Sequence, residues 1–216
     1  FESYPRDFER DCKVLEKAGA AAVFNPTAEE MYGDNFTTYV NTTGVTENLC
    51  GKSRPVHFKG VCTVVLKLFN IVTPDRAYFG QKDAQQVQVI KHMVKDLFFN
   101  VQLRIMPIVR EADGLAKSSR NTYLSPEERK AGLVLSRSLR QAETLFQQGE
   151  RNGAELVEVV REMIAVEPLS EIDYVEIYAL PDLTPLAGKI AGPCLLAVAV
   201  RFGTTRLIDN IILEGA

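Results

Sequence analysis

Cysteine is scarce in this sequence, with only four residues among 216. These four, Cys12, Cys50, Cys62 and Cys194, are too widely spaced for a zinc pair and too few to staple a scaffold of this size. No cluster of Cys and His occurs elsewhere, so the sequence predicts no metal site built from protein ligands alone. We expect the cysteines to be small apolar core residues in a reducing compartment.

Long apolar runs and a strong charge of either sign are also missing. No run reaches the roughly 20 apolar residues that a membrane span requires, and the first residues do not resemble a secretory leader. The formal net charge of −3 gives no general attraction to nucleic acid or anionic lipid. We therefore expect a cytoplasmic protein with no nucleic-acid or membrane partner, whose positive potential is concentrated locally.

Several common enzyme motifs do not occur. The sequence has no Gly-x-Gly-x-x-Gly and no Gly-x-Ser-x-Gly, which weakens dehydrogenase and hydrolase interpretations. Gly51-Lys52-Ser53 resembles the end of a P-loop, but the glycine expected five positions earlier is Thr46. Neither an internal repeat nor a low-complexity tract is present.

The first half of the chain alternates strand-like and helix-like segments. Helices are expected at 7–17, 28–31, 60–72 and 83–97, and strands at 20–24, 37–40, 77–79 and 101–108. Such alternation implies a parallel, Rossmann-like sheet with ligands outside the carboxyl ends of its strands. The fold class is thus α/β, and we expect residues 1–108 to form a nucleotide-binding domain that is incomplete at its amino end.

The second half has a different order. A capping box and a proline at 125–128 predict the start of a helix that runs to 148, and a second helix is expected at 154–164. Strand patterns then follow at 173–179, 195–202 and 205–212. Helices followed by adjacent strands indicate a smaller α+β domain, which we expect at residues 109–216.

The segment Gly80-Gln81-Lys82-Asp83-Ala84-Gln85-Gln86 joins a predicted strand to a predicted helix. Lys82 would strengthen the positive potential of the helix start, which favours a phosphate or carboxylate. Gln86 lies one helical turn after Asp83, so both side chains can face one ligand. The alternatives are a solvated Lys82 beside a capping Asp83, and a Gln86 that is merely a surface residue.

A second polar segment, Lys117-Ser118-Ser119-Arg120-Asn121, places two hydroxyls beside a guanidinium, which suits phosphate oxygens. The alternative is a polar turn whose serines bond their own backbone. Arg54 could clamp a carboxylate, and His57 could contact a ligand or be a satisfied side chain; His92 is expected to be exposed. Together these segments favour a site for two anionic substrates.

The sequence resembles a known family, the pantothenate synthetases. The similarity covers essentially the whole chain. The matching segments are 4–6 (YPR), 53–61 (SRPVHFKGV), 67–70 (KLFN), 74–75 (PD), 78–86 (YFGQKDAQQ), 110–124 (READGLAKSSRNTYL) and 206–210 (RLIDN).

The resemblance implies a cytoplasmic, homodimeric ligase that condenses D-pantoate with β-alanine, using ATP and Mg²⁺, through a pantoyl adenylate. It further implies that Lys82 and residues Ser118, Ser119 and Arg120 are catalytic and hold the ATP phosphates. Gly80 and Asp83 would bind the ribose, Val109 the adenine through its backbone, and Gln86 the pantoate. Lys117 would complete the ATP-binding loop, and Arg54 and His57 are further candidates.

The sequence departs from the family pattern in two respects. Val56 stands where the family has glycine, which stiffens that loop. The family's His-x-Gly-His motif and a pantoate-binding glutamine do not occur in the 216 residues, so we expect poor adenylation by this chain alone. Two alternatives remain open, namely another nucleotidyltransferase of the same superfamily, or a noncatalytic nucleotide-binding or dimer-forming fragment.

Overall fold

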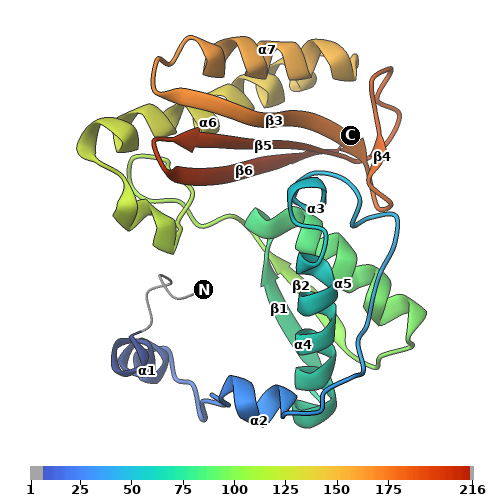
Figure 1. Ribbon diagram of the computed structural model, residues 1–216. Helices are drawn as coiled ribbons and strands as arrows, with labels where there is room; N and C mark the ends of the chain where they lie inside the picture. Colours follow the sequence, from blue (N-terminus) through green and yellow to red (C-terminus); the bar gives the residue numbers. More distant parts are fainter. Residues whose placement is uncertain (1–6, 215–216) are drawn as a thin grey trace. The chain divides into compact units, whose positions relative to one another are not determined.

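The structure, a computed structural model, describes residues 7–214 (Figure 1). The chain divides into two compact units, residues 1–38 and residues 39–216, which are described separately below. The segment at 4–6 that contributes to the family resemblance lies outside the described residues. No helix among the described residues is long and apolar enough to cross a membrane.

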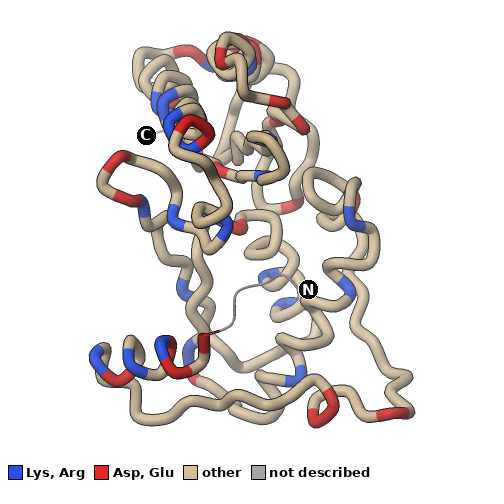
Figure 2. Tube along the Cα trace, turned by 60° about the vertical axis from the view of Figure 1, so that its left-hand side comes forward, with Lys and Arg blue, Asp and Glu red and all other residues tan. Residues whose placement is uncertain are grey.

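The first unit contains two short helices. Helix α1 (Phe8–Lys17) begins at Asp7, whose carboxylate accepts a hydrogen bond from the Arg10 N–H at 3.0 Å. Helix α2 (Ala28–Tyr32) begins with a capping box at Thr27. Both helices confirm the sequence prediction. Acidic and basic residues are interspersed along α1, as Figure 2 shows.

Two of the predicted strands are wrong. Residues 20–24 form no strand, and Val23 and Phe24 are 45% and 54% exposed. Residues 37–40 are also irregular. A strand exists only where a neighbour satisfies its backbone groups, and no described residues pair with either segment. Apolar composition alone therefore did not suffice to form a strand.

The second unit contains a parallel strand pair covered by helices. Strands β1 (Arg76–Gly80) and β2 (Gln102–Met106) pair from Arg76 opposite Gln102 to Gly80 opposite Met106. Helix α4 (His57–Val72) precedes β1, and α5 (Ala84–Asp96) connects the strands. The short helix α3 (Cys50–Ser53) lies before α4. The predicted strand–helix–strand crossover is confirmed.

An antiparallel sheet backed by two helices follows. Its strands are β3 (Ser170–Ala179), β4 (Thr184–Pro185), β5 (Cys194–Phe202) and β6 (Thr205–Leu213), in the order β4-β3-β5-β6. The helices are α6 (Pro126–Gln147) and α7 (Gly153–Ala165). The predicted capping box at Ser125 and Glu128 is present. The sequence missed β4, which has only two residues.

Strand β5 is buried on both faces and so lies between two hydrophobic cores. Leu196 and Val198 pack into one core with α6 and α7. Leu195 and Ala197, which alternate with them, belong to a second core that contains residues of α4 and α5. The second core holds the start of α5 close to the antiparallel sheet, and β6 contacts the turn before α5.

The cysteine prediction is correct for only two residues. Cys62 and Cys194 are buried core residues, whereas Cys12 and Cys50 are partly exposed, and all four are free thiols. Cys50 differs because α3 places it at the wall of a cavity rather than inside a core.

Candidate functional site

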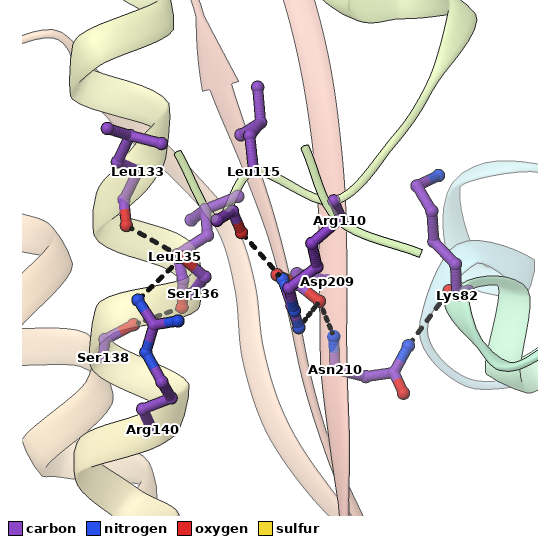
Figure 3. A network of polar contacts seen from close by, with 12 residues as sticks. Lys82, Arg110, Leu115, Leu133, Leu135, Ser136, Ser138, Arg140, Asp209 and Asn210 are labelled. Atoms are coloured by element: carbon purple, nitrogen blue, oxygen red, sulfur yellow. Dashed lines mark hydrogen bonds and ion pairs between the residues drawn. The ribbon is translucent and has the colours of Figure 1, made fainter. Parts of the chain in front are cut away.

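The turn that carries Lys82 is held by strand β6. Strand β1 ends at Gly80, and the 3₁₀ turn η1 (Gln81–Asp83) leads into α5. The Asn210 side-chain amide donates to the carbonyl oxygens of Gln81 and Lys82, at 3.2 and 3.0 Å. The Gln81 amide donates back to the Asn210 oxygen at 3.3 Å. In Figure 3 the Lys82 side chain points away from Asn210.

A cavity of about 150 Å³ lies beside this turn. Six of the residues singled out in the sequence line it. They are Arg54, His57, Lys82, Asp83, Gln86 and Arg120. These side chains come from three separate parts of the sequence. The fold brings them together around one cavity. We refer to this space as the first cavity.

A second, smaller cavity adjoins the same lysine. It is lined by Lys82, Ser118 and Arg120 together with Arg206 and Asp209. Lys82 and Arg120 therefore take part in both cavities, and Ser118 only in the second. The Lys82 turn and the Ser118–Arg120 segment thus meet at one cavity, which three cations and Ser118 line. That composition suits phosphate oxygens.

The segment between β2 and α6 is fixed to β6 by an ion pair. The Arg110 guanidinium donates to both oxygens of Asp209, at 2.6 and 3.0 Å, and to the Gly114 carbonyl oxygen at 3.2 Å. The Asp209 side chain is only 2% exposed. Because a buried carboxylate requires such a partner, this pair ties the polar segment to the sheet.

The rest of that segment is braced by a second group of charges. Asn121 donates to the Glu111 carboxylate at 2.7 Å and to the Ala116 carbonyl oxygen at 3.1 Å. Arg129 donates to Glu111 and to Asp113, at 2.9 and 2.7 Å. The hydrogen bond from Asn121, followed by that from Arg129, lowers the pKa of Glu111 below its ordinary value.

The serine pair does not act as a unit. The Ser118 hydroxyl accepts from the Arg120 N–H at 3.3 Å, so the local turn that was the alternative interpretation is present. Ser118 nevertheless lines the second cavity, whereas Ser119 is exposed. Lys117 is exposed, and its N–H donates to the Val109 carbonyl oxygen at 2.9 Å.

Four sequence candidates lie outside the lining of the two cavities as far as the described residues go. They are Gly80, Val109, Lys117 and Ser119. Val109 is 65% exposed. Its carbonyl oxygen accepts a hydrogen bond from the Lys117 N–H.

Arg54 and His57 enter the first cavity from the α3–α4 junction. Arg54 caps the end of α3, and His57 is the first residue of α4. Desolvation lowers the pKa of His57, and the positive charge of Arg54 lowers it further. The Asp83 carboxylate opposes this shift, and Arg120 adds to it. The site thus favours a neutral imidazole.

Neighbouring glutamines have different surroundings. Gln85 is buried, and its amide donates to the Val45 and Asn48 carbonyl oxygens at 3.0 and 2.6 Å. It therefore supports the loop before α3. Gln86 is partly exposed and lines the first cavity, which makes it the better ligand contact.

The expectation of an exposed His92 is wrong, because its Nε2 lies 3.4 Å from the Asp182 carboxylate and is shielded from solvent.

Sequence reasoning assigned no role to several residues of the first cavity. They are Cys50, Tyr174, Arg206, Asp209 and Asn210. Burial and the neighbouring Cys50 raise the pKa of Tyr174 far above its ordinary value, so its hydroxyl stays protonated. The 206–210 segment had been noticed only through the family resemblance. Nothing in the sequence around Tyr174 or Cys50 marks either residue.

A family model described as "Pantoate-beta-alanine ligase" matches residues 1–212. The chain belongs to this family. Family membership identifies it as an ATP-dependent ligase of pantoate and β-alanine, as the sequence predicted, and does not favour the alternative of another nucleotidyltransferase or a noncatalytic fragment. The predicted fold class, a Rossmann-like domain with a smaller α+β domain, is confirmed as well.

Curated relatives and solved structures agree with this assignment. The pantothenate synthetase of Pelotomaculum thermopropionicum is 58% identical over 213 residues, which cover 99% of this chain and 75% of the relative. That of Acetivibrio thermocellus is 57% identical, with 99% and 76% covered. The crystal structure of pantothenate synthetase from Thermus thermophilus matches with a TM-score of 0.91 at 46% identity, covering 97% of this chain and 75% of that one.

A second solved structure contains ligands. The pantoate-beta-alanine ligase from Francisella tularensis, complexed with "Beta-gamma ATP and Beta-alanine", matches with a TM-score of 0.75 at 30% identity. The match covers 98% of this chain and 72% of that one.

Proposed function

We propose that the two cavities around Lys82 are the site of pantoate adenylation. In this proposal Lys82, Ser118, Ser119 and Arg120 are the catalytic residues that bind the ATP phosphates. The observation that carries the proposal is that Lys82 and Arg120 line both cavities, with Ser118 in the second. Fixed cations around a developing phosphate charge are the usual source of catalysis in such transfers.

The chemistry follows from the need to activate a carboxylate. A pantoate carboxylate oxygen attacks the α-phosphorus of ATP, and the bond from that phosphorus to the pyrophosphate oxygen breaks. Lys82 and Arg120 would stabilise the negative charge that builds up on the phosphate oxygens. The amine of β-alanine then attacks the acyl carbon and displaces AMP. The Asn210 hydrogen bond to the Lys82 backbone keeps the cation in place during both steps.

The remaining substrate contacts are proposed by family resemblance and by position. Gln86 would bind pantoate in the first cavity, and Asp83 and Gly80 would bind the ATP ribose. Val109 would contact the adenine through its backbone, with Lys117 next to it. Arg54 and His57 line the first cavity and would contact the substrates there.

Mg²⁺ is proposed to enter with ATP. Among the described residues there is no group of three or more His, Cys, Asp or Glu side chains that could hold a metal ion. That fits Mg²⁺, which is generally held by substrate phosphates, water and one or two carboxylates rather than by a protein cage. Asp83, which lines the first cavity, would be the available carboxylate. When bound, the ion would neutralise charge on the phosphates.

The domain boundary, the oligomeric state and the location of the protein are also proposals. Residues 1–108 would form the nucleotide- and pantoate-binding domain and residues 109–216 a carboxy-terminal lid domain, with the boundary at the end of β2. The protein would be a homodimer, which sedimentation velocity tests directly. A cytoplasmic location suits the four free thiols.

Pantoate-dependent exchange of pyrophosphate into ATP tests the assignment. In a protein that also carries the family's His-x-Gly-His segment, we expect Lys82→Ala to reduce the exchange rate roughly 100- to 1,000-fold, the usual effect of losing one such donor. Lys91→Ala is the matched control, because Lys91 is an exposed lysine further along α5. Unchanged exchange in the Lys82 variant would refute its phosphate role. Exchange that proceeds without pantoate would refute the acid specificity.

A further inference from the structure

Cys50 lies in a polar cluster at the wall of the first cavity and is partly exposed. Its sulfur is 3.5 Å from the Tyr174 hydroxyl, and the two terminal nitrogens of Arg206 donate to it at 3.7 and 3.8 Å. Arg206 is also held by the Asp173 carboxylate, at 2.7 Å, and by the Tyr174 hydroxyl. Its positive charge is therefore fixed beside the sulfur. Reactive cysteines lie in such electropositive, partly exposed surroundings, whereas buried structural cysteines are inert.

The walls of the first cavity carry more positive than negative charge. They include four cationic side chains and two carboxylates, namely Arg54, Lys82, Arg120, Arg206, Asp83 and Asp209. Of the two carboxylates, Asp209 already accepts two hydrogen bonds from Arg110. The formal net charge of the whole chain is −3, so this excess of cations is local. A cleft lined by one sign of charge concentrates small ions of the opposite sign.

A buried side chain in the same wall lacks a partner. Gln85 lines the first cavity and is 6% exposed. Its amide nitrogen donates to the Val45 and Asn48 carbonyl oxygens, whereas its Oε1 has no hydrogen-bond partner among the described residues. Buried polar atoms are nearly always hydrogen-bonded, and a molecule in the cavity can supply the missing donor. This orphan acceptor is a second indication, independent of the cysteine, that the cavity holds a ligand.

We propose that Cys50 is a covalent modification site for small electrophiles that carry a carboxylate. The cations attract the carboxylate, and the cavity of about 150 Å³, roughly the size that holds benzene, has room for such a molecule beside the sulfur. Iodoacetate serves as the test compound. The sulfur attacks its methylene carbon, an S–C bond forms, and the C–I bond breaks. Iodide leaves with the electron pair, and the thiol proton passes to water.

The three other cysteines provide internal references. Cys62 and Cys194 are buried, and burial raises the pKa of both thiols, so both should react slowly with either charged or neutral reagents. Cys12, on α1, is partly exposed like Cys50 but lines neither cavity. Cys12 therefore reports how each reagent reacts with a thiol outside the cationic cavity.

A matched pair of reagents tests the proposal on the chain itself. Iodoacetate and iodoacetamide share the reactive carbon and differ only in a carboxylate against a neutral amide. Peptide mass spectrometry measures the alkylation rate at each cysteine. We expect the ratio of the iodoacetate rate to the iodoacetamide rate to be at least roughly tenfold higher at Cys50 than at Cys12, as local concentration of anions in a cationic cleft implies. Added salt should reduce this difference.

A charge variant links the preference to the cavity. Lys82→Ala removes one of the cations and should lower the rate ratio at Cys50. Lys91→Ala, which changes an exposed lysine outside the cavity lining, should not. Equal ratios at Cys50 and Cys12 in the folded, unaltered protein would overturn the proposal. A Cys50 that reacts only after denaturation would overturn it as well, because the sulfur would then be closed off from the cavity.

The consequence for activity rests on the proposed function. In a protein that also carries the family's His-x-Gly-His segment, carboxymethylation of Cys50 should abolish pantoate-dependent exchange in step with labelling, because the added group occupies the first cavity. Cys50→Ala should keep the activity that it has before treatment. Exchange that survives complete labelling would show that the adduct leaves the substrate cavity open. Absence of exchange before treatment would count against the proposed function alone, since the labelling ratio decides independently on Cys50.

Discussion

The side-chain amide of Asn210 donates a hydrogen bond to the carbonyl oxygen of Lys82 at 3.0 Å (Figure 3). The two residues lie 128 positions apart in the sequence. Asn210 is 3% exposed, and the next residue toward the amino end, Asp209, is paired with Arg110. Strand β6 thereby connects the turn that carries Lys82 with the segment that carries Ser118 and Arg120. Displacement of either segment would separate the two halves of the proposed phosphate site.

Asn210→Ala should therefore impair catalysis through Lys82. The change leaves two backbone carbonyls without their donor, which costs about 1–3 kcal/mol of unfolding free energy when such groups are buried. We expect kcat to fall at least tenfold, because a small displacement of a catalytic cation is costly. Steady-state kinetics with saturating ATP, pantoate and β-alanine measure kcat, and chemical denaturation measures the stability.

A replacement at the same position separates the hydrogen bond from packing. Asn210→Asp keeps the size of the side chain but cannot donate to the Gln81 and Lys82 carbonyls, so it should be at least as harmful as alanine. Asn100→Asp is the control, since Asn100 is exposed. Near-normal kcat in Asn210→Asp would show that Asn210 does not position Lys82.

Much of the local structure was predictable because it depends on short-range chemistry. The capping box at Ser125 and Glu128 located the start of α6, and the glycine-terminated strand before Lys82 located the turn before α5. Both features bring together residues a few positions apart. For the same reason the sequence could indicate the two segments, around Lys82 and Ser118, that line the second cavity.

The remaining features depend on contacts between distant segments. Arg206 and Tyr174 lie on strands β6 and β3, and only the antiparallel sheet places them beside Cys50. The segment 20–24 has an apolar composition suited to a strand, yet an isolated strand does not form without a neighbour to pair with. The local sequence does not reveal which distant segment a residue contacts, or whether a strand has a neighbour to pair with.

The role of Gly51 also depends on a contact that the sequence does not reveal. The sequence suggested only an incomplete P-loop around Gly51. In the structure, a Cβ atom added to Gly51 would lie 1.7 Å from the Thr46 carbonyl oxygen. Helix α3 therefore requires a glycine where its backbone packs against Thr46, and the start of this helix carries Leu49 and Cys50 to the first cavity.

Gly51→Ala should destabilise the protein and weaken substrate binding together. A backbone clash of this size forces the loop to move, so we expect a loss of several kcal/mol, at the upper end of the effects of single substitutions. Gly60→Ala is the matched control, because a Cβ at Gly60, inside α4, meets nothing within 4 Å. That change should raise stability by about 0.4–1 kcal/mol. Equal melting temperatures for the two variants would contradict this explanation.

His57 should make the stability of the protein fall as the pH drops below about 6.5. Its pKa is lowered in the folded protein by desolvation and by Arg54, whereas the unfolded chain has the ordinary value of about 6.5. Between these two values the unfolded chain binds more protons than the folded protein. The contribution of His57 to stability is therefore full above about pH 6.5 and falls as the pH drops toward the lowered pKa.

The prediction is tested in a His92→Gln background, where His57 is the only histidine left of the two in the sequence. In that background the free energy of unfolding should decrease between about pH 7.5 and 5.5, a window that lies above the ordinary carboxylate values. Adding His57→Gln should flatten this slope, because the titrating group is gone. The charged groups that face His57 are Arg54, Asp83 and Arg120. If the unfolding free energy depends on pH equally with and without His57, the cavity leaves the pKa of His57 unchanged. The site would then not favour a neutral imidazole.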